Sequence, residues 1–394
     1  MNKNLEFQPK ADHPMDGKIK NSPPKVVLVH DYLKEYGGAE SVLETLSDLF
    51  PEAPIYTTLY CPRFLGPHRA RLEKKWQGRI HQSFFRFIPF AYKIISPLRL
   101  LSPLAFRLFN FSSTDLIISS ATGAYFPNSI NKSSAKLICY CHTPPRYLYG
   151  LPTARNLTNN KIIRALALFV NHWLRLLDFH WAQNVDLFIA NSSTTSSRIQ
   201  KFYRRDSVII NPPVDVSGVK SPLSSKGDVR RTGGFLTGGR LARAKRYDIA
   251  IAACNQLKLP LKVFGRDFAG YTDELKAMAG PTIEFVGEVT EIQKWQLFSE
   301  AKAYIFPSDN EDFGIVAVEA QACGCSVVGY NSGGIAETVI DGKTGVLFDE
   351  LTVDSCISAI KKLEKLDIKP STCITNAKSF SKEVFISKIK KIAS

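Results

Sequence analysis

Short runs of consecutive apolar residues alternate with amphipathic stretches along most of this chain. In the first half the apolar runs occupy residues 26–30, 116–119, 137–140 and 187–190. After the first run, Gly37-Gly38 opens a stretch in which Val42, Leu43 and Leu46 recur at helical spacing. Runs that are apolar throughout, rather than alternating, indicate parallel strands that helices cover on both faces.

The second half repeats this alternation more regularly. We expect its strands at 235–238, 261–264, 283–286, 303–306, 326–329 and 345–348, and its helices at 245–257, 290–301, 314–323 and 352–365. Strands and helices in alternation predict a doubly wound α/β domain. The expected organisation is a disordered tail (1–24), a first domain (25–212), a polar linker rich in Ser, Gly and Lys (213–233), a second domain (234–380), and a helix (381–393) that packs back on the first domain.

The charge of the chain narrows the possible partners. Its 394 residues carry a net charge of +15, which suits nucleic acid, an anionic membrane or a phosphorylated ligand. Because no zinc-finger spacing, basic heptad array or RNA-recognition signature occurs, we expect no nucleic-acid partner. No uncharged apolar stretch is long enough for a transmembrane helix, and the first residues do not resemble a signal peptide. A cytoplasmic protein is therefore expected.

Two carboxylates, Glu311 and Glu319, lie eight residues apart, and Gly314 stands between them. Glu311 follows the strand expected at 303–306, and ligands of open α/β sheets bind at the carboxyl ends of strands. Gly314 stands near the expected helix start, where free N–H groups and the positive end of the helix dipole favour phosphate. Glu319 lies among apolar residues, and ribose hydroxyls would partner a buried carboxylate. A capping glutamate followed by a helix-surface glutamate is the alternative.

Three further motifs could contribute to the same site. Arg240 and Lys245 follow a strand and could both reach a diphosphate, the first in bidentate fashion and the second as a point charge. Gly37-Gly38 would allow close approach of the backbone to a ligand. His142 ends a strand before a Pro-rich loop, which favours a position beside a ligand. The alternatives are a solvated basic loop, a tight turn and a structural histidine.

The motifs HDY, GGAE, CHTPPRY, GGRLARAKR, FVGEV, EDFGIVAVE and NSGGIAETV occur in this order. Over about residues 25–390 the chain thereby resembles the large retaining glycosyltransferase family four. The resemblance implies the GT-B fold, in which two Rossmann-like domains face each other across a cleft and the N-terminal domain takes the acceptor. The HDY start and the CHTPPRY loop look most like mannosyltransferases of bacterial O-antigen and exopolysaccharide synthesis.

The resemblance also implies a role for each matching residue. Arg240 and Lys245 match the pair of basic residues that binds the donor diphosphate, and His142 matches a histidine near the reacting centre. Glu311 matches the glutamate that contacts the donor sugar, and Glu319 the one that binds ribose. Backbone contacts are implied for Gly37 and Gly38 at the diphosphate or sugar, for Val286, Gly287, Glu288 and Val289 at the base, and for Phe313, Gly314 and Ile315 at the sugar and phosphate. At 264–268 the sequence FGRDF departs from the usual Gly-rich turn, so contacts to base and ribose there stay open.

The resemblance implies transfer of a hexose with retention of configuration, and it favours GDP-mannose as the donor. The favoured acceptor is a polyprenyl-linked sugar or an oligosaccharide in lipopolysaccharide or other cell-surface polysaccharide synthesis. No two aspartates have DxD spacing, so we expect neither a metal nor another cofactor. Two alternatives stay open: another nucleotide-sugar enzyme of the same fold, such as an epimerase, and a catalytically silent subunit that binds a sugar nucleotide.

Residues 84–111 are dense in aromatic and aliphatic side chains and contain no acid. They carry Arg86, Lys93, Arg99 and Arg107, and three prolines exclude one long helix. Basic and aromatic residues together suit a membrane interface. This segment therefore predicts a peripheral protein on the inner face of the plasma membrane. The alternative is that it covers the core of the first domain.

Overall fold

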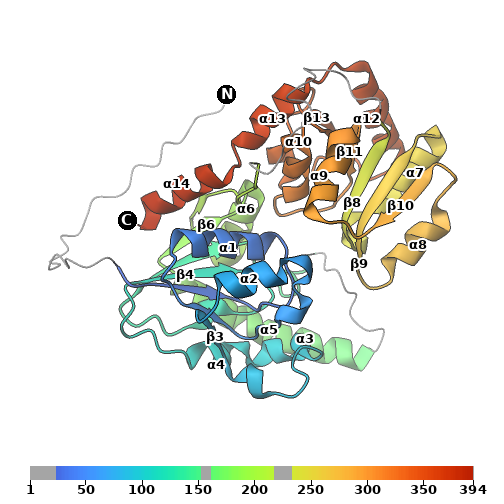
Figure 1. Ribbon diagram of the computed structural model, residues 1–394. Helices are drawn as coiled ribbons and strands as arrows, with labels where there is room; N and C mark the ends of the chain where they lie inside the picture. Colours follow the sequence, from blue (N-terminus) through green and yellow to red (C-terminus); the bar gives the residue numbers. More distant parts are fainter. Residues whose placement is uncertain (1–23, 152–160, 217–232, 394) are drawn as a thin grey trace.

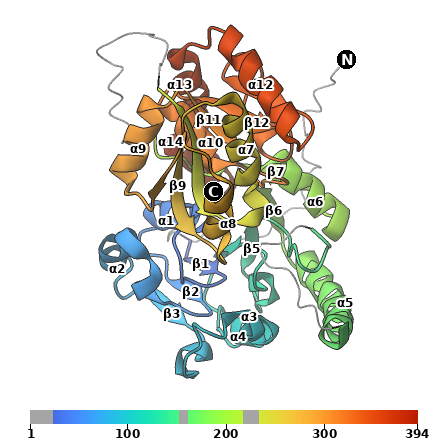
Figure 2. The ribbon, with the colours of Figure 1, turned by 90° about the vertical axis from the view of Figure 1, so that its right-hand side faces the viewer.

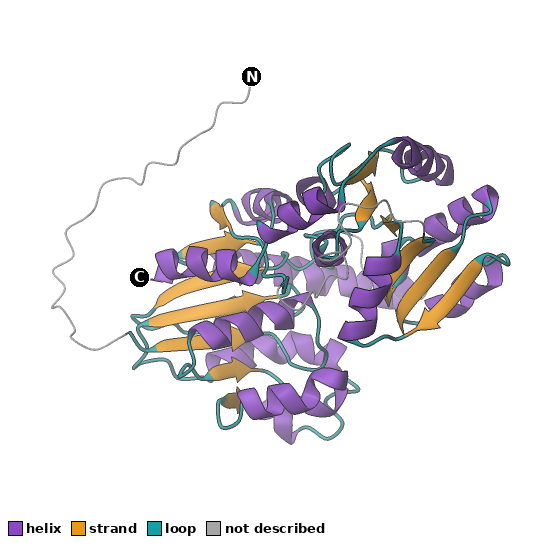
Figure 3. Cartoon of the chain, turned by 45° about the horizontal axis from the view of Figure 1, so that its top comes forward, coloured by secondary structure: helices purple, strands orange, loops and turns teal. Residues whose placement is uncertain are grey.

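The computed structural model describes residues 24–151, 161–216 and 233–393, which form two α/β domains, each built on one parallel sheet (Figure 1). The expected tail lies outside the described residues apart from Pro24, and so does most of the expected linker. Helices cover both faces of each sheet (Figure 3). Both halves of the chain therefore have the layered α/β architecture that their apolar patterns predict.

The first sheet has seven strands in the order β3-β2-β1-β4-β5-β6-β7. These strands are β1 (Val26–His30), β2 (Ile55–Thr57), β3 (Ile80–Gln82), β4 (Leu116–Ala121), β5 (Lys136–Cys141), β6 (Leu187–Ala190) and β7 (Ser207–Ile209). The helices of this domain are α1 (Gly38–Leu49), α2 (Arg69–Lys75), α3 (Ile95–Leu98), α4 (Ser102–Arg107), α5 (Lys161–Gln183) and α6 (Ser193–Tyr203).

The second sheet has six strands in the order β10-β9-β8-β11-β12-β13. They are β8 (Phe235–Leu241), β9 (Leu261–Asp267), β10 (Ile283–Gly287), β11 (Ala303–Phe306), β12 (Ser326–Tyr330) and β13 (Gly345–Phe348). The accompanying helices are α7 (Tyr247–Leu257), α8 (Tyr271–Met278), α9 (Glu291–Glu300), α10 (Ile315–Ala322), α11 (Ile335–Thr338), α12 (Val353–Lys365) and α13 (Pro370–Lys378).

The last helix, α14 (Lys382–Ala393), leaves the second domain and lies along the first (Figure 1). Lys382 Nζ donates to Asp48 Oδ2 at 2.7 Å, and the Phe385 ring packs against Tyr140 with 5.8 Å between centroids. Phe385 and Ile389 are buried in the same apolar cluster as Leu28 and Leu43. The end of the chain is thus part of the first domain's core.

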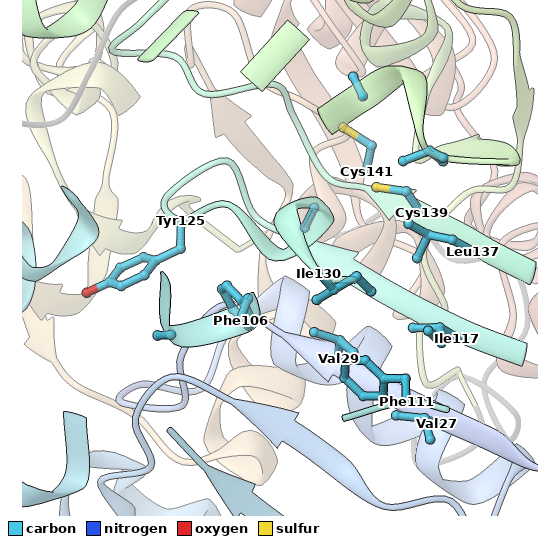
Figure 4. Packing of buried hydrophobic residues seen from close by; sticks show 14 of the residues in the cluster. Val27, Val29, Phe106, Phe111, Ile117, Tyr125, Ile130, Leu137, Cys139 and Cys141 are labelled. Atoms are coloured by element: carbon cyan, nitrogen blue, oxygen red, sulfur yellow. The ribbon is translucent and has the colours of Figure 1, made fainter. Parts of the chain in front are cut away.

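Apolar side chains fill both faces of the first sheet. Val27 and Val29 point to one face, where they join Ile117, Phe106 and Phe111 (Figure 4). The alternate residue Leu28 packs on the opposite face, as the two-residue period of a strand requires. Because Phe106 and Phe111 belong to the segment 84–111, part of that segment does cover the core.

The start of the second domain differs from expectation at one functional motif. Strand β8 continues to Leu241, so Arg240 lies on the strand and not on a loop after it. The next helix begins at Tyr247, because Arg243–Lys245 form a 3-10 turn and Arg246 has a left-handed φ of 53°. Arg240 and Lys245 are therefore held by different elements, a strand end and a tight turn.

Candidate functional site

The order of strands reverses once in each sheet. In the second sheet the reversal lies between β8 and β11, and in the first it lies between β1 and β4. At such a point the connections leave in opposite directions, which opens a ligand site outside the carboxyl ends of the two strands. The motif GGRLARAKR begins within the last residues of β8 and EDFGIVAVE follows β11, so both stand at the reversal point of the second sheet.

Lys245 and Glu311 meet at this point. Lys245 Nζ donates to Glu311 Oε2, which also accepts a 2.8 Å hydrogen bond from Ser308 Oγ. Burial alone would raise the pKa of Glu311, but Lys245, Ser308 and Arg146 outweigh it, so the pKa lies below its usual value. Glu311 is therefore a half-buried carboxylate that stays ionised at neutral pH, and Lys245 balances its charge.

The second glutamate has a different partner. Glu319 lies on α10, and its Oε1 accepts a 3.0 Å hydrogen bond from Lys294 Nζ on α9. Burial raises the pKa of Glu319, and Lys294 only partly opposes this. Lys294 was not among the predicted site residues. Its position four residues after a Thr290 N-cap on an unremarkable helix gives no sign that it reaches Glu319.

Arg240 faces the first domain. Its Nη1 lies 3.7 Å from Glu35 Oε2, and the same oxygen lies 3.6 Å from Nη2 of Arg266. Arg240 and Arg266 are paired residues on β8 and β9, so their side chains leave the sheet on one side. Arg240 and Lys245 thus lie in the same region but share no partner. Arg266, within the FGRDF departure noted above, is a further cation that sequence reasoning missed.

Gly314 shapes the loop that carries Glu311. It is the N-cap of α10 with φ 82°, and a Cβ there would lie 2.3 Å from Ile335 Cδ1. The NSGG motif packs on the same loop, because Gly334 N donates to Glu311 O at 2.8 Å and a Cβ at Gly333 would meet that oxygen at 2.1 Å. The two motifs therefore form one tightly packed unit, which places Phe313, Gly314 and Ile315 together at the start of α10.

Gly37 and Gly38 stand opposite that unit. Gly37 is the N-cap of α1 with an extended φ of −154°, and a Cβ at Gly38 would lie 4.0 Å from Ile315 Cδ1 of the second domain. Neither glycine has a left-handed φ, so the turn itself does not require them. Gly38 leaves space beside Ile315 of the second domain, whereas a Cβ at Gly37 would meet Glu40 Oε2 of its own helix at 3.4 Å.

His142 follows β5 in the first domain. Its Nε2 lies 3.0 Å from Ser120 Oγ, and burial lowers the pKa of its imidazole to about 3. The neighbouring Thr143 accepts a 3.1 Å hydrogen bond from Arg198, whose Nη1 also pairs with Asp312. His142 is therefore a neutral imidazole on a loop that lies beside the Glu311 loop of the other domain.

Ion pairs and hydrogen bonds that sequence reasoning missed join the two domains here. Arg146, in the CHTPPRY loop, donates to Asp312 Oδ1 and to Asn310 O, both at 2.7 Å. Glu337 accepts hydrogen bonds from the backbone N and the hydroxyl of Ser193, at 2.9 and 2.7 Å. The arginines stood in the sequence as ordinary basic residues, and only the three-dimensional contact identifies their partners.

The segment 286–289 spans the end of β10 and the turn before α9. Val286, Gly287 and Glu288 are exposed, and Gly287 has φ 83°. An exposed turn of this kind offers backbone groups to a ligand. Among the described residues, no group of three or more His, Cys, Asp or Glu side chains could hold a metal ion.

Two family models match the chain. The model described as Glycosyltransferase Family 4 matches residues 36–217, and the model described as Glycosyl transferases group 1 matches residues 232–380. The first match lies in the first domain and the second covers almost all of the second sheet and its helices.

Curated relatives are glycosyltransferases of several specificities. The chain is 32% identical over 170 residues to the lipopolysaccharide core biosynthesis mannosyltransferase LpcC of Rhizobium leguminosarum bv. viciae, which covers 38% of this chain and 47% of that protein. It is 30% identical over 188 residues to a D-inositol 3-phosphate glycosyltransferase of Actinosynnema mirum, covering 41% and 45%. The chain is 23% identical to an alpha-1,3/1,6-mannosyltransferase of Mus musculus, and this match covers 69% of this chain and 71% of that protein. The chain spans about half the length, or less, of most of the curated relatives it matches best.

Solved structures share the whole architecture. HepE of Anabaena, solved with UDP and glucose, matches with a TM-score of 0.66 and 20% identity over 94% of this chain and 99% of that one. Sucrose-phosphate synthase of Thermosynechococcus elongatus matches with a TM-score of 0.67 and 15% identity over 93% and 98%. With two Rossmann-like domains, both family models and these relatives, the chain belongs to family four of the GT-B glycosyltransferases.

Proposed function

We propose that this protein transfers a hexose, with mannose favoured, from a nucleoside-diphosphate donor to a lipid-linked or saccharide acceptor in cell-surface polysaccharide synthesis, with retention of configuration. The observation that carries the proposal is the half-buried pair of Lys245 and Glu311 at the strand reversal of the second sheet. It puts a cation and an ionised carboxylate beside the helix start at Gly314. A sugar diphosphate needs that combination, because its phosphates require positive charge and its hydroxyls require an acceptor.

The proposed step is a displacement on one face of the sugar. The bond between the anomeric carbon and the β-phosphate oxygen breaks, the acceptor oxygen forms the new bond from the same side, and its proton passes to the departing phosphate. Negative charge grows on the departing phosphate, where Lys245, Arg240 and the amides at Gly314 would stabilise it. Because two cations and a helix start are available, we propose that no metal ion is needed. A neutral His142 would accept a hydrogen bond from a substrate hydroxyl.

The relatives' names support mannose but leave the base of the donor open. Two of the relatives cited above are mannosyltransferases, whereas HepE was solved with UDP. We favour GDP-mannose and expect GDP to raise the melting temperature more than UDP or ADP does. A ligand at a hundred times its Kd stabilises the folded state by about 2.7 kcal/mol.

The matching activity experiment is slow hydrolysis of the donor, with and without EDTA. We expect release of the nucleoside diphosphate, at an unchanged rate when EDTA is present. Release of no product would favour a silent binding subunit, and recovery of an epimerised sugar nucleotide would favour an epimerase. Loss of activity with EDTA that Mg²⁺ restores would contradict metal independence.

We further propose that the first domain rests on an anionic membrane where it meets a polyprenyl-linked acceptor. Two neighbouring segments carry most of the large exposed apolar side chains: Phe87, Phe90, Ile94, Leu100, Leu101, Leu104 and Leu108 in 84–111, and Leu168, Phe169, Trp173, Leu176, Leu177 and Phe179 on α5. The segments touch, because the Arg107 guanidinium on α4 lies 5.8 Å from the Trp181 ring on α5. Figure 2 shows α3, α4 and α5 at the lower end of the first domain. No described helix is long and apolar enough to cross a membrane.

The charges of this surface support an anionic partner. Arg86, Lys93, Arg107 and Arg175 are exposed on it. Arg99 is different, because its guanidinium lies 4.3 Å from the Tyr147 ring and its Nε is buried. Asp178, which is the only acid in the two segments, is buried and hydrogen-bonded to Tyr149. Basic and apolar groups without exposed acid are typical of surfaces that bind anionic lipid.

We expect the protein to sediment with anionic liposomes at low salt, and less so as salt rises. Changing Arg86, Lys93, Arg107 and Arg175 together to Gln should abolish sedimentation without lowering donor hydrolysis, since each cation near the surface contributes about 1 kcal/mol. The matched control changes Lys361, Lys365, Lys388 and Lys390, which lie on α12 and α14, to Gln. Wild-type protein that stays in the supernatant, or equal losses in both variants, would contradict the proposal.

A further inference from the structure

A row of buried polar side chains crosses the carboxyl edge of the first sheet. His30 ends β1, Ser120 lies on β4 and His142 follows β5, and these three strands are neighbours. His30 and Ser120 are register partners, with 3.1 Å between His30 Nδ1 and Ser120 Oγ. Ser120 Oγ in turn lies 3.0 Å from His142 Nε2. Both His30 and Ser120 have no exposed surface.

The row continues to the start of α1. Glu40 Oε1 lies 3.6 Å from His30 Nε2, a charge contact too long for a hydrogen bond, and Glu40 Oε2 accepts a 2.9 Å hydrogen bond from the backbone N of Gly37. Glu40 is 6% exposed. One connected set of polar contacts therefore runs from the Gly37-Gly38 turn to the ring of His142.

Packing alone does not account for this row. A buried hydroxyl or imidazole costs free energy unless it is hydrogen-bonded, and apolar residues of similar size would fill the same space without that cost. The row also connects the Gly37-Gly38 turn with His142, and the proposed function places both of these against the donor. We infer that Glu40, His30 and Ser120 are positioning residues that fix the ring orientation and the tautomer of His142, an inference that rests on the proposed function.

The donor and the acceptor of each hydrogen bond can be assigned along the row, starting from Glu40. A carboxylate oxygen attracts a proton, so we place the proton of His30 on Nε2, which faces Glu40 Oε1 at a distance too long for a hydrogen bond. His30 Nδ1 then accepts from the Ser120 hydroxyl, and the Ser120 oxygen accepts from His142 Nε2–H. This leaves the Nδ1 lone pair of His142 as the acceptor for a substrate hydroxyl. Histidine tautomers are set in this way by the group bound to the other ring nitrogen.

A double-mutant cycle tests the inference. We expect Ser120→Ala to lower kcat for donor hydrolysis about tenfold, as removal of a group that orients an active-site ligand does, with little change in KM for the donor. In a His142→Ala background the same change should have no further effect, because Ser120 acts through His142. The matched control is Ser119→Ala, which removes a buried hydroxyl from the same strand that bonds Asn128 instead. Equal losses for Ser119→Ala, or additive losses in the cycle, would overturn the inference.

An imidazole ¹⁵N spectrum gives a readout that does not depend on turnover. The chain has seven histidines, and the signal of His142 is the one lost in His142→Gln. We expect a neutral His142 protonated on Nε2 in the wild type and in Ser119→Ala, and a changed tautomer ratio in Ser120→Ala. A wild type protonated on Nδ1, or a signal that Ser120→Ala leaves unmoved, would contradict the assignment. If the spectrum is as expected but no nucleotide sugar is hydrolysed, the proposed function fails and the positioning remains.

Discussion

Glu311→Gln is expected to lower turnover of the nucleotide sugar by about a hundredfold or more while the fold survives, the size of loss seen when one transition-state contact is removed. The glutamine keeps the shape of the side chain and can still accept from Ser308, but it lacks the negative charge. In the wild type the pKa of Glu311 lies below its usual value, so that charge is present throughout neutral pH. The loss should therefore appear in kcat and not only in KM for the donor.

Steady-state hydrolysis and acceptor-dependent transfer both measure this effect. The control is Glu350→Gln, which neutralises an exposed carboxylate in the same domain and should leave turnover unchanged. The melting temperature of each variant separates a catalytic loss from unfolding. Wild-type turnover in Glu311→Gln would show that this carboxylate does not contact the reacting sugar.

The repeating apolar pattern was enough to predict two α/β units, because buried parallel strands read as continuous apolar runs. Strand β1 and the strands of the second domain were predicted close to their observed bounds. The short strands β2, β3 and β7, of which β3 and β7 form the edges of the first sheet, were missed. Each has only three residues, and β3 and β7 are largely exposed, so their sequences carry too little apolar character to stand out.

Helix α5 was missed for a different reason. Its 23 residues are amphipathic, but exposed Leu168, Phe169 and Trp173 add apolar character to the face turned away from the core, which blurs the helical period. This same feature makes α5 relevant to membrane contact. The segment 84–111 mixes the two roles that its composition suggested, because Phe85 and Phe106 are buried while Phe87 and Phe90 are exposed.

Residues of the candidate site could be predicted where a motif contains the charged residue and also lies at the end of a recognisable strand. Glu311 and Lys245 were both named from sequence, and they are in contact. The ion pairs of other charged residues could not be predicted. They join Lys294 to Glu319, Glu35 to Arg240, and Asp312 to two arginines of the other domain. These contacts join segments far apart in sequence, and a single charged residue gives no sign of its distant partner.

The second large effect is expected for Lys245→Met. It should weaken binding of the nucleoside diphosphate about tenfold to a hundredfold, since a hydrogen bond to a charged group contributes about 1.5–3 kcal/mol. Binding of the nucleoside alone should stay as in the wild type, because the proposed function assigns Lys245 to the phosphates and not to the base. Calorimetric titration with GDP and guanosine measures both. Lys362→Met, which removes a surface partner of Asp341, is the control.

Lys245→Met should also change how stability depends on pH. In the wild type the pKa of Glu311 is lowered on folding, so its ion pair stabilises the fold above the unfolded pKa and is lost as pH falls through the folded pKa. Without Lys245, burial acts with less opposition and the pKa of Glu311 rises. The variant should therefore be most destabilised at neutral pH and approach the wild type under acid conditions, and adding Glu311→Gln should recover stability at neutral pH. Equal weakening of GDP and guanosine, together with a pH-independent loss of stability, would mean that Lys245 supports the fold and does not hold the phosphates.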